Sequence, residues 1–349
     1  MLVFGGIALI ATGMLFGDIF AVFVLHQNGG ETGRALLNAA QAVAAQDPSA
    51  VTAAFAHMGN LLEDHGTKVD AHVHMIDAGY LALLLAVVQP YVTISASSKK
   101  RLAKLFLTGG LLLPVGIFLI HYVGMSYSPF PVIGWASILA DSAGALLIVV
   151  LLAEGWGFWK YLRSRRVDPV EPELSPRISH DRTWERRTLL SGGTVLMLMG
   201  FIYGAWYAGE NLYEHENRET VILKDLLDQP AGATGLASSV NAYGMLQAEK
   251  AVQIAAHSHI IEFGLLAILL SFVQPYVFLS ERWKRIWVRV LLAGSVILPV
   301  FVLLELKMGL LAGGIADAGG LMVVVALVGM LVGVLRHTGS LDAELGRAR

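Results

Sequence analysis

Long apolar stretches alternate with shorter charged segments along this chain. A helix needs about 20 mostly apolar residues to cross the hydrocarbon core of a bilayer. Eight stretches are long enough, so the pattern predicts eight membrane-spanning helices. They lie at about 2–25, 71–95, 102–124, 133–158, 189–208, 254–279, 286–308 and 312–335.

Two of these stretches are nearly the same sequence. Residues 72–92 and 257–277 are identical at 13 of 21 positions, and both run from His-x-His to Gln-Pro-Tyr-Val. The likeness extends to the other helices: Gly13 and Gly17 recur as Gly200 and Gly204, Leu113-Pro114 as Leu298-Pro299, and Ala140-Asp141 as Ala316-Asp317. We therefore expect an all-α integral membrane protein of two parallel four-helix repeats, related by an axis along the membrane normal.

The predicted organisation has four parts. Residues 1–160 form the first four-helix transmembrane repeat and residues 161–187 a basic linker. Residues 188–337 form the second repeat, and residues 338–349 a short tail. The long connections after the first helix of each repeat (for example 34–64, rich in Ala and Leu) predict short amphipathic helices lying over the outer surface.

Composition and charge support a membrane protein and orient it. Hydrophobic residues make up 55% of the chain and charged residues only 15%, against about 25% charged in soluble proteins. The net charge of −2 gives no indication of nucleic-acid binding, and we expect no nucleic-acid partner. Lys and Arg concentrate in the connections after predicted helices 2, 4 and 6 and in the tail, which places both termini and the linker in the cytoplasm. The long loops then face outward, to the periplasm of a bacterium with this protein in its inner membrane. The N-terminal stretch lacks a basic region, so we interpret it as a retained span rather than a cleaved signal.

The chain contains no cysteine. This excludes disulfides, thiolate metal sites, iron–sulfur clusters and covalent c-type haem attachment. Histidine, carboxylate and methionine side chains remain as potential ligands for a metal or a cofactor.

The paired histidines are the first candidates for a cofactor site. Residues i and i+2 of a helix point about 200° apart, so His72 and His74 cannot both bind one ion, nor can His257 and His259. Whatever they bind must therefore involve other elements as well. Gly79 and Gly264 follow at i+7, where small residues leave room for a flat macrocycle or allow close helix packing.

A carboxylate accompanies the second histidine of each pair. Asp77 lies three residues after His74, and Glu262 three after His259, so each pair shares a helix face. Such a carboxylate orients a ligating histidine or hands over a proton. The alternative is a buried polar pair whose members satisfy each other.

Other ionisable groups are predicted at the same depth near the outer surface. Ionisable side chains within spans are costly and are functional candidates by default. A copper or zinc site needs three or four converging ligands. The first repeat has more histidines than the second and so is the more suitable of the two. Haem b needs one or two axial nitrogens and an apolar slot, and a bis-histidine haem with one ligand from each repeat is a further arrangement. The additional candidates are His26, His65 and His121 as ligands, with Asp141, Asp317 and Glu305 as proton-relay or supporting groups.

Each repeat resembles the small four-helix membrane proteins related to subunit I of the haem-copper oxidases, including nitric oxide reductase. The resemblance lies in a glycine-rich first helix, a second helix opening with His-x-His, a basic turn and a proline-containing third helix. The typical opening is similar to His-Ala-His-Leu-Asn-Leu-Leu-Gly-Trp. This chain has His72, His74 and Gly79, and His257, His259 and Gly264, in the corresponding places. The resemblance implies haem b on one histidine of each repeat.

The chain also departs from that family. It has no later His-x-His helix and no further histidine set for a copper and a high-spin haem, so an oxygen- or nitric-oxide-reducing site is not expected. The leading hypothesis is a haem b-binding, cytochrome b-like electron-transfer protein, a candidate oxidoreductase subunit of a respiratory chain. Its partners would be quinol, a periplasmic carrier or other respiratory subunits. The alternatives are a copper- or zinc-binding or transport protein, and a cofactor-free assembly subunit.

Overall fold

The computed structural model describes residues 1–20, 26–123, 135–163, 183–207, 212–228 and 234–336. Every regular element in these ranges is a helix, and the expectation of an all-α protein is confirmed. Seven helices are long and apolar enough to cross a membrane, so the chain is a multi-pass membrane protein. They are α1 (Leu2–Phe20), α3 (Pro48–Val88), α4 (Ala96–Val123), α5 (Trp135–Arg163), α9 (Thr234–Val273), α10 (Glu281–Met308) and α11 (Leu310–Leu335).

The eighth expected span falls in helix α7 (Trp184–Trp206), which is not among these seven. The first turn of α7 carries three charged residues from Glu185 to Arg187 before its apolar part begins. Position 208, the end of the predicted span, lies outside the described residues.

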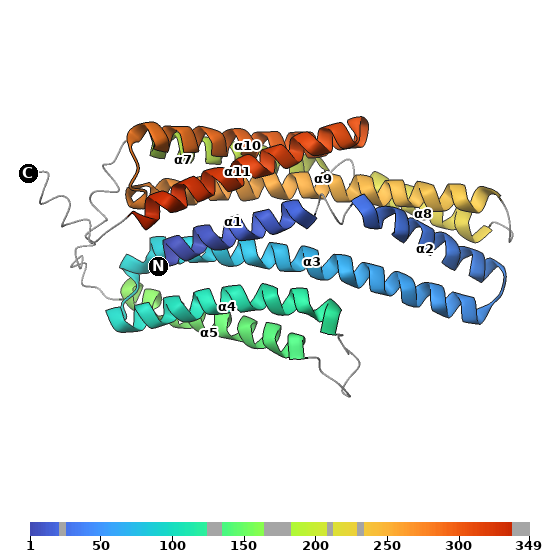
Figure 1. Cartoon of the computed structure of the whole chain (residues 1–349), viewed down its shortest axis with the longest axis horizontal. Coiled ribbons are helices and arrows are strands. Elements are labelled where there is room, and N and C mark those ends of the chain that lie inside the picture. Colours follow the sequence, from blue (N-terminus) through green and yellow to red (C-terminus); the bar gives the residue numbers. More distant parts are fainter. Residues whose placement is uncertain (21–25, 124–134, 164–182, 208–211, 229–233, 337–349) are drawn as a thin grey trace, which may run out of the picture.

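The segments that were expected to lie over the outer surface are helical, but their arrangement differs from the predicted short surface helices. α3 and α9 continue far beyond the apolar segments, with α2 (His26–Ala44) and α8 (Leu212–Asp228) packed along them. Figure 1 shows these four segments extending together beyond the bundle. Because α3 begins at Pro48 and not near residue 71, the His-x-His pair lies well inside a continuous helix and not at its start.

Local sequence signals explain where α3 begins and ends. Asp47 caps its N-terminus by accepting hydrogen bonds from the backbone amides of Ser49 (3.0 Å) and Ala50 (3.1 Å), with Pro48 in the first turn. At the other end Pro90 has no N–H to donate, and the chain passes through a short 3-10 helix, Gln89–Tyr91, into extended backbone. The same Gln-Pro-Tyr sequence ends α9, at Gln274–Tyr276.

Close backbone approaches hold the first two helices of each half together. A Cβ on Gly79 of α3 would lie 2.8 Å from the carbonyl oxygen of Gly6 in α1. A Cβ on Gly264 of α9 would lie 2.8 Å from the carbonyl oxygen of Gly193 in α7. Glycine at these positions lets the two backbones touch, as in close-packed membrane helices.

The two halves also make matching contacts just after their Gln-Pro-Tyr segments. The backbone N–H of Thr93 donates to the carbonyl of Gly157 (3.0 Å), and that of Phe278 donates to Gly333 (3.1 Å). In the second half, α10 and α11 are joined by Gly309 alone, whose φ of +59° is readily adopted only by glycine.

The halves meet mainly where α1 packs on α11, and where α2 and α3 pack on α9. One apolar core crosses this boundary, from Ile7 and Ile10 of α1 to Val323 and Leu327 of α11. Figure 1 shows α1 lying between α11 and α3, with α4 and α5 beyond α3. The helices from both halves therefore share one core around α1.

Candidate functional site

A cavity of about 560 Å³ lies between the two halves. Its walls come from α1, α3, α9, α10 and α11, and most of them are apolar. Five His, Asp or Glu side chains line it, together with Tyr80: Asp18, His72, His259, Glu262 and Asp317. This volume lies within the range of about 300–1,000 Å³ that is usual for small-molecule sites.

His72 enters the cavity wall from α3 and is held in a defined orientation. Its Nδ1 lies 2.6 Å from the carbonyl oxygen of Gly13 in α1. A carbonyl can only accept, so Nδ1 carries a proton and donates, and in the neutral ring Nε2 keeps its lone pair. The ring lies against Gly17, where any Cβ would overlap it. The glycines of α1 thus position this histidine and set its tautomer.

His257 is held in the same way in the second half. Its Nδ1 donates to the carbonyl of Gly200 in α7 at 3.1 Å, and its ring lies against Gly204. His257 is not among the residues that line the cavity between the halves.

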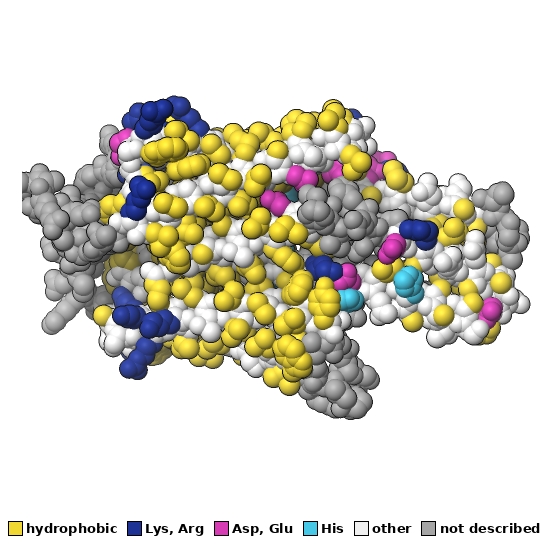
Figure 2. All heavy atoms as spheres, viewed as in Figure 1, with side chains coloured by type: hydrophobic (Ala, Val, Ile, Leu, Met, Phe, Trp, Pro, Cys, Tyr) yellow, Lys and Arg dark blue, Asp and Glu magenta, His cyan; other side chains and the backbone are white. Residues whose placement is uncertain are grey.

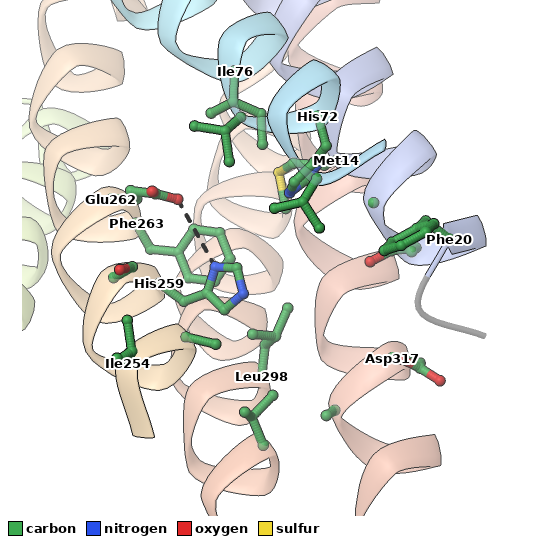
Figure 3. Close-up of a pocket in the computed structure, with 18 of the residues that line it drawn as sticks. Met14, Phe20, His72, Ile76, Ile254, His259, Glu262, Phe263, Leu298 and Asp317 are labelled. Atoms are coloured by element: carbon green, nitrogen blue, oxygen red, sulfur yellow. Dashed lines mark ion pairs between the residues drawn. The ribbon is translucent and has the colours of Figure 1, made fainter. Parts of the chain in front are cut away.

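The second histidines of the two pairs have different surroundings. His259 lines the cavity, with its Nδ1 3.8 Å from Glu262 Oε2. Figure 3 shows this ion pair beside Phe263, with His72 and Met14 on another wall. His74 is exposed, and its Nδ1 donates to the carbonyl of Asp70 at 2.8 Å, one turn back in the same helix. The predicted pairing of histidine and acid is thus seen for His259 with Glu262.

The remaining sequence-predicted residues lie elsewhere. His121 of α4 pairs with Asp64 of α3 (3.2 Å), and Lys68 pairs with the same carboxylate. Asp77 and Asp141 are exposed. Glu305 is half-buried beside Gly313 of α11. The side chains of His26 and His65 lie outside the described ones.

The small residues of the histidine stripe serve close packing. α1 fills the space over Gly79, where a Cβ would lie 3.0 Å from the backbone nitrogen of Ile10. The backbone of α7 approaches Gly264 equally closely, since a Cβ there would lie 2.8 Å from the nitrogen of Met197. A macrocycle along this stripe would have to displace α1 or α7. The cavity between the halves provides room for a ligand beside His72.

Two contributors were not among the predicted site residues. Asp18 of α1 packs on Gly320 of α11, and its Oδ2 is buried with no hydrogen-bond partner among the described residues. The sequence signal for Asp18 was its charge within an apolar span. Tyr80 of α3 donates its hydroxyl to the backbone carbonyl of Glu262 in α9 at 3.1 Å. This hydrogen bond joins the two halves, and nothing in the sequence pairs the two residues.

Among the residues that the structure describes, no three His, Cys, Asp or Glu side chains are grouped so that they could hold a metal ion. No protein-family model, curated protein or solved structure matches the chain.

Proposed function

We propose that the chain is a bacterial inner-membrane protein of two four-helix repeats, with α7 as an eighth span and both termini in the cytoplasm. The matching contacts support the repeat: Gly13 with His72 and Gly200 with His257, and the paired bonds to Gly157 and Gly333. The orientation rests on charge. Figure 2 shows most of the visible Lys and Arg side chains at one end of the bundle, while most of the Asp, Glu and His side chains in that view lie toward the other.

We propose further that the cavity between the halves binds haem b, and that the protein transfers electrons in a respiratory chain. The observation that carries this proposal is the orientation of His72. A hydrogen bond from Nδ1–H to a backbone carbonyl is the usual support for a ligating histidine, because it leaves Nε2 unprotonated and fixes the ring.

The lining residues suit haem b because they supply histidine nitrogens as ligands and mostly apolar walls. His72 from one half and His259 from the other would hold the group through their ring nitrogens, and Glu262 would orient His259. Met14, Phe263 and Leu298 would exclude water from the cavity. Haem b, when bound, supplies one-electron chemistry whose potential depends on its axial ligands and on burial. Because the cavity lies toward the outer ends of the helices, quinol or a periplasmic carrier would be the electron partner.

The test is a reduced-minus-oxidised spectrum of the protein purified from membranes in mild detergent. We expect a haem b α-band, and we expect His72→Ala to abolish it or to lower haem content at least 10-fold. His257→Ala is the matched control, because it removes the same hydrogen bond to a glycine carbonyl but lies off the cavity. A wild-type protein without an α-band would overturn the haem assignment.

A second candidate function is binding or transport of a metal cation such as copper or zinc. Three carboxylates, Asp18, Glu262 and Asp317, line the cavity, and the described residues that line it include no Lys or Arg. An excess of acidic over basic side chains in a cavity wall favours a positively charged ligand.

Metal analysis of the same preparation separates the two functions. Iron with an α-band supports haem b, whereas copper or zinc without iron supports the second candidate. In the second case Asp18→Asn should lower the metal content, because it removes a carboxylate but keeps the shape of the side chain. A colourless protein without bound metal would contradict both and leave the cofactor-free assembly subunit.

A further inference from the structure

The two halves of the chain pack together head to tail. α1 of the first half lies on α11 of the second. In the sequence repeat, α7 corresponds to α1 and α5 corresponds to α11. A twofold arrangement would also place α7 on α5, but Figure 1 shows these two helices on opposite sides of the molecule. Such a head-to-tail contact leaves one complementary face open at each end.

The open faces are exposed where their counterparts are buried. Ala11 of α1 is 7% exposed, and its counterpart Leu198 of α7 is 58% exposed. Val324 of α11 is 6% exposed, and its counterpart Ile148 of α5 is 59% exposed. The apolar character of these positions is thus kept in both halves, but only one set is covered within the chain.

The glycine at the centre of the covered contact shows the same difference. A Cβ on Gly320 of α11 would lie 2.6 Å from Asp18 Oδ1 of α1. Its counterpart on α5 is Gly144, where the nearest atom to a Cβ would be a Leu113 methyl at 3.9 Å. Among the described residues, no atom of α7 lies within 4 Å of this position.

Lipid alone is a poor cover for the α5 face. Asp141 and Ser142 are exposed on α5, inside a helix that is apolar enough to span the membrane. The counterpart of Asp141 is Asp317, which lies in the cavity between the halves. An ionisable side chain turned toward lipid within a span is costly, and such residues almost always face protein or water.

We propose that a second copy of this chain covers this face, with its α7 packed on α5 as α1 packs on α11. Each copy carries both open faces, so two copies can make the contact twice and close into a ring of four four-helix units. The proposal rests on the repeat proposed above and does not depend on the bound cofactor.

The chain has no native cysteine, so only introduced cysteines of this chain can form disulfides in native membranes. Position 205 is the counterpart of Asp18, and we choose Ala205→Cys with Gly144→Cys. Two differently tagged single variants, A205C and G144C, are co-expressed and mildly oxidised. We expect most of the chain to shift to the mass of a disulfide-linked dimer that carries both tags. Each single variant expressed alone should give at least 10-fold less dimer.

The matched control is the intrachain pair Asp18→Cys with Gly320→Cys, which should form its disulfide without changing the mass of the chain. If this pair closes while the co-expressed single variants remain monomeric, the proposal is overturned. Light scattering of the wild-type protein in mild detergent gives an independent measure, with twice the chain mass expected and a monomer contradicting it. The haem spectrum is measured separately, so the dimer proposal and the haem proposal can fail independently of each other.

Discussion

His72 and His257 make the same hydrogen bond to a glycine carbonyl of the preceding span, and both rings lie against a second glycine. The histidines two residues later are different. His259 faces the cavity beside Glu262, whereas His74 is exposed and bonded to its own helix. The first histidine of each pair makes the same contact because each half needs it to pack its own helices. The second histidine differs because His259 meets the other half at the cavity, whereas His74 does not.

The largest expected effect concerns the contact that the halves share. Gly17→Ala and Gly204→Ala each place a Cβ into a histidine ring, so the ring must leave its carbonyl partner. We expect each to lower the free energy of unfolding by about 1–3 kcal/mol, as overpacking usually does. Thermal unfolding in detergent would measure this. Gly59→Ala is the control, because a Cβ there meets nothing within 4 Å. If all three variants unfold alike, the histidine does not depend on these glycines.

The next prediction concerns the position at which the halves differ. His259→Ala removes a side chain from the cavity, and His74→Ala removes its counterpart from an exposed face. We expect His259→Ala to weaken cofactor or metal retention by about 10–100-fold, the usual cost of losing a ligand or its supporting residue. His74→Ala should change retention less than about 2-fold, within the scatter of a surface substitution. Haem or metal content per chain measures both, and equal losses would contradict the assigned difference between the halves.

A smaller effect is expected at the bond between the halves. Tyr80→Phe removes the hydroxyl that donates to Glu262. It should cost about 1 kcal/mol, the usual net value of one hydrogen bond. The corresponding residue in the second half, Leu265, has no hydroxyl, so this bond has no counterpart. Thermal unfolding of Tyr80→Phe against the exposed control Tyr122→Phe tests it. An unchanged midpoint would show that the hydroxyl does not hold the halves together.

The smallest effect is expected at the outer end of α3. Hydrogen bonds from the Ser49 hydroxyl and the Ala50 and Ser49 amides lower the pKa of Asp47 below the usual value for aspartate. The stabilisation that Asp47 gives to the helix N-terminus is therefore fully present when the pH is above the usual pKa of aspartate. It is lost as the pH falls through the lowered pKa of Asp47. The protection of the amides in the first turn of α3, measured as exchange relative to the intrinsic rate at the same pH, should fall as the pH falls through the lowered pKa. Asp47→Asn should keep the cap without this pH dependence, since Asn caps as well as Asp, and Asp47→Ala should lose the cap at every pH. The prediction is contradicted if the Asp47→Asn variant loses protection at low pH as much as the wild-type protein does.

The helical class and the approximate positions of seven apolar helices follow from the sequence, because apolar length and helix-ending prolines are local properties. The outer parts of α3 and α9 were not predicted as continuous with the spans, since the Ala-rich segment before His72 is too polar to be recognised as part of a span. The proposed duplication also starts from sequence, because identity at a constant spacing needs no contact to be recognised.

The composition of the site was decided by the tertiary structure. His72 and His259 were both candidates, but only the packing of the halves selects them over their sequence counterparts His257 and His74. Asp18 and Tyr80 enter the site through contacts with α11 and α9, on segments far away in the chain. The sequence by itself determined which residues could do chemistry and the helices that carry them. The way in which the two similar halves meet decided which of these residues share a cavity. Because α1 packs on α11 head to tail, corresponding residues of the two halves have different surroundings.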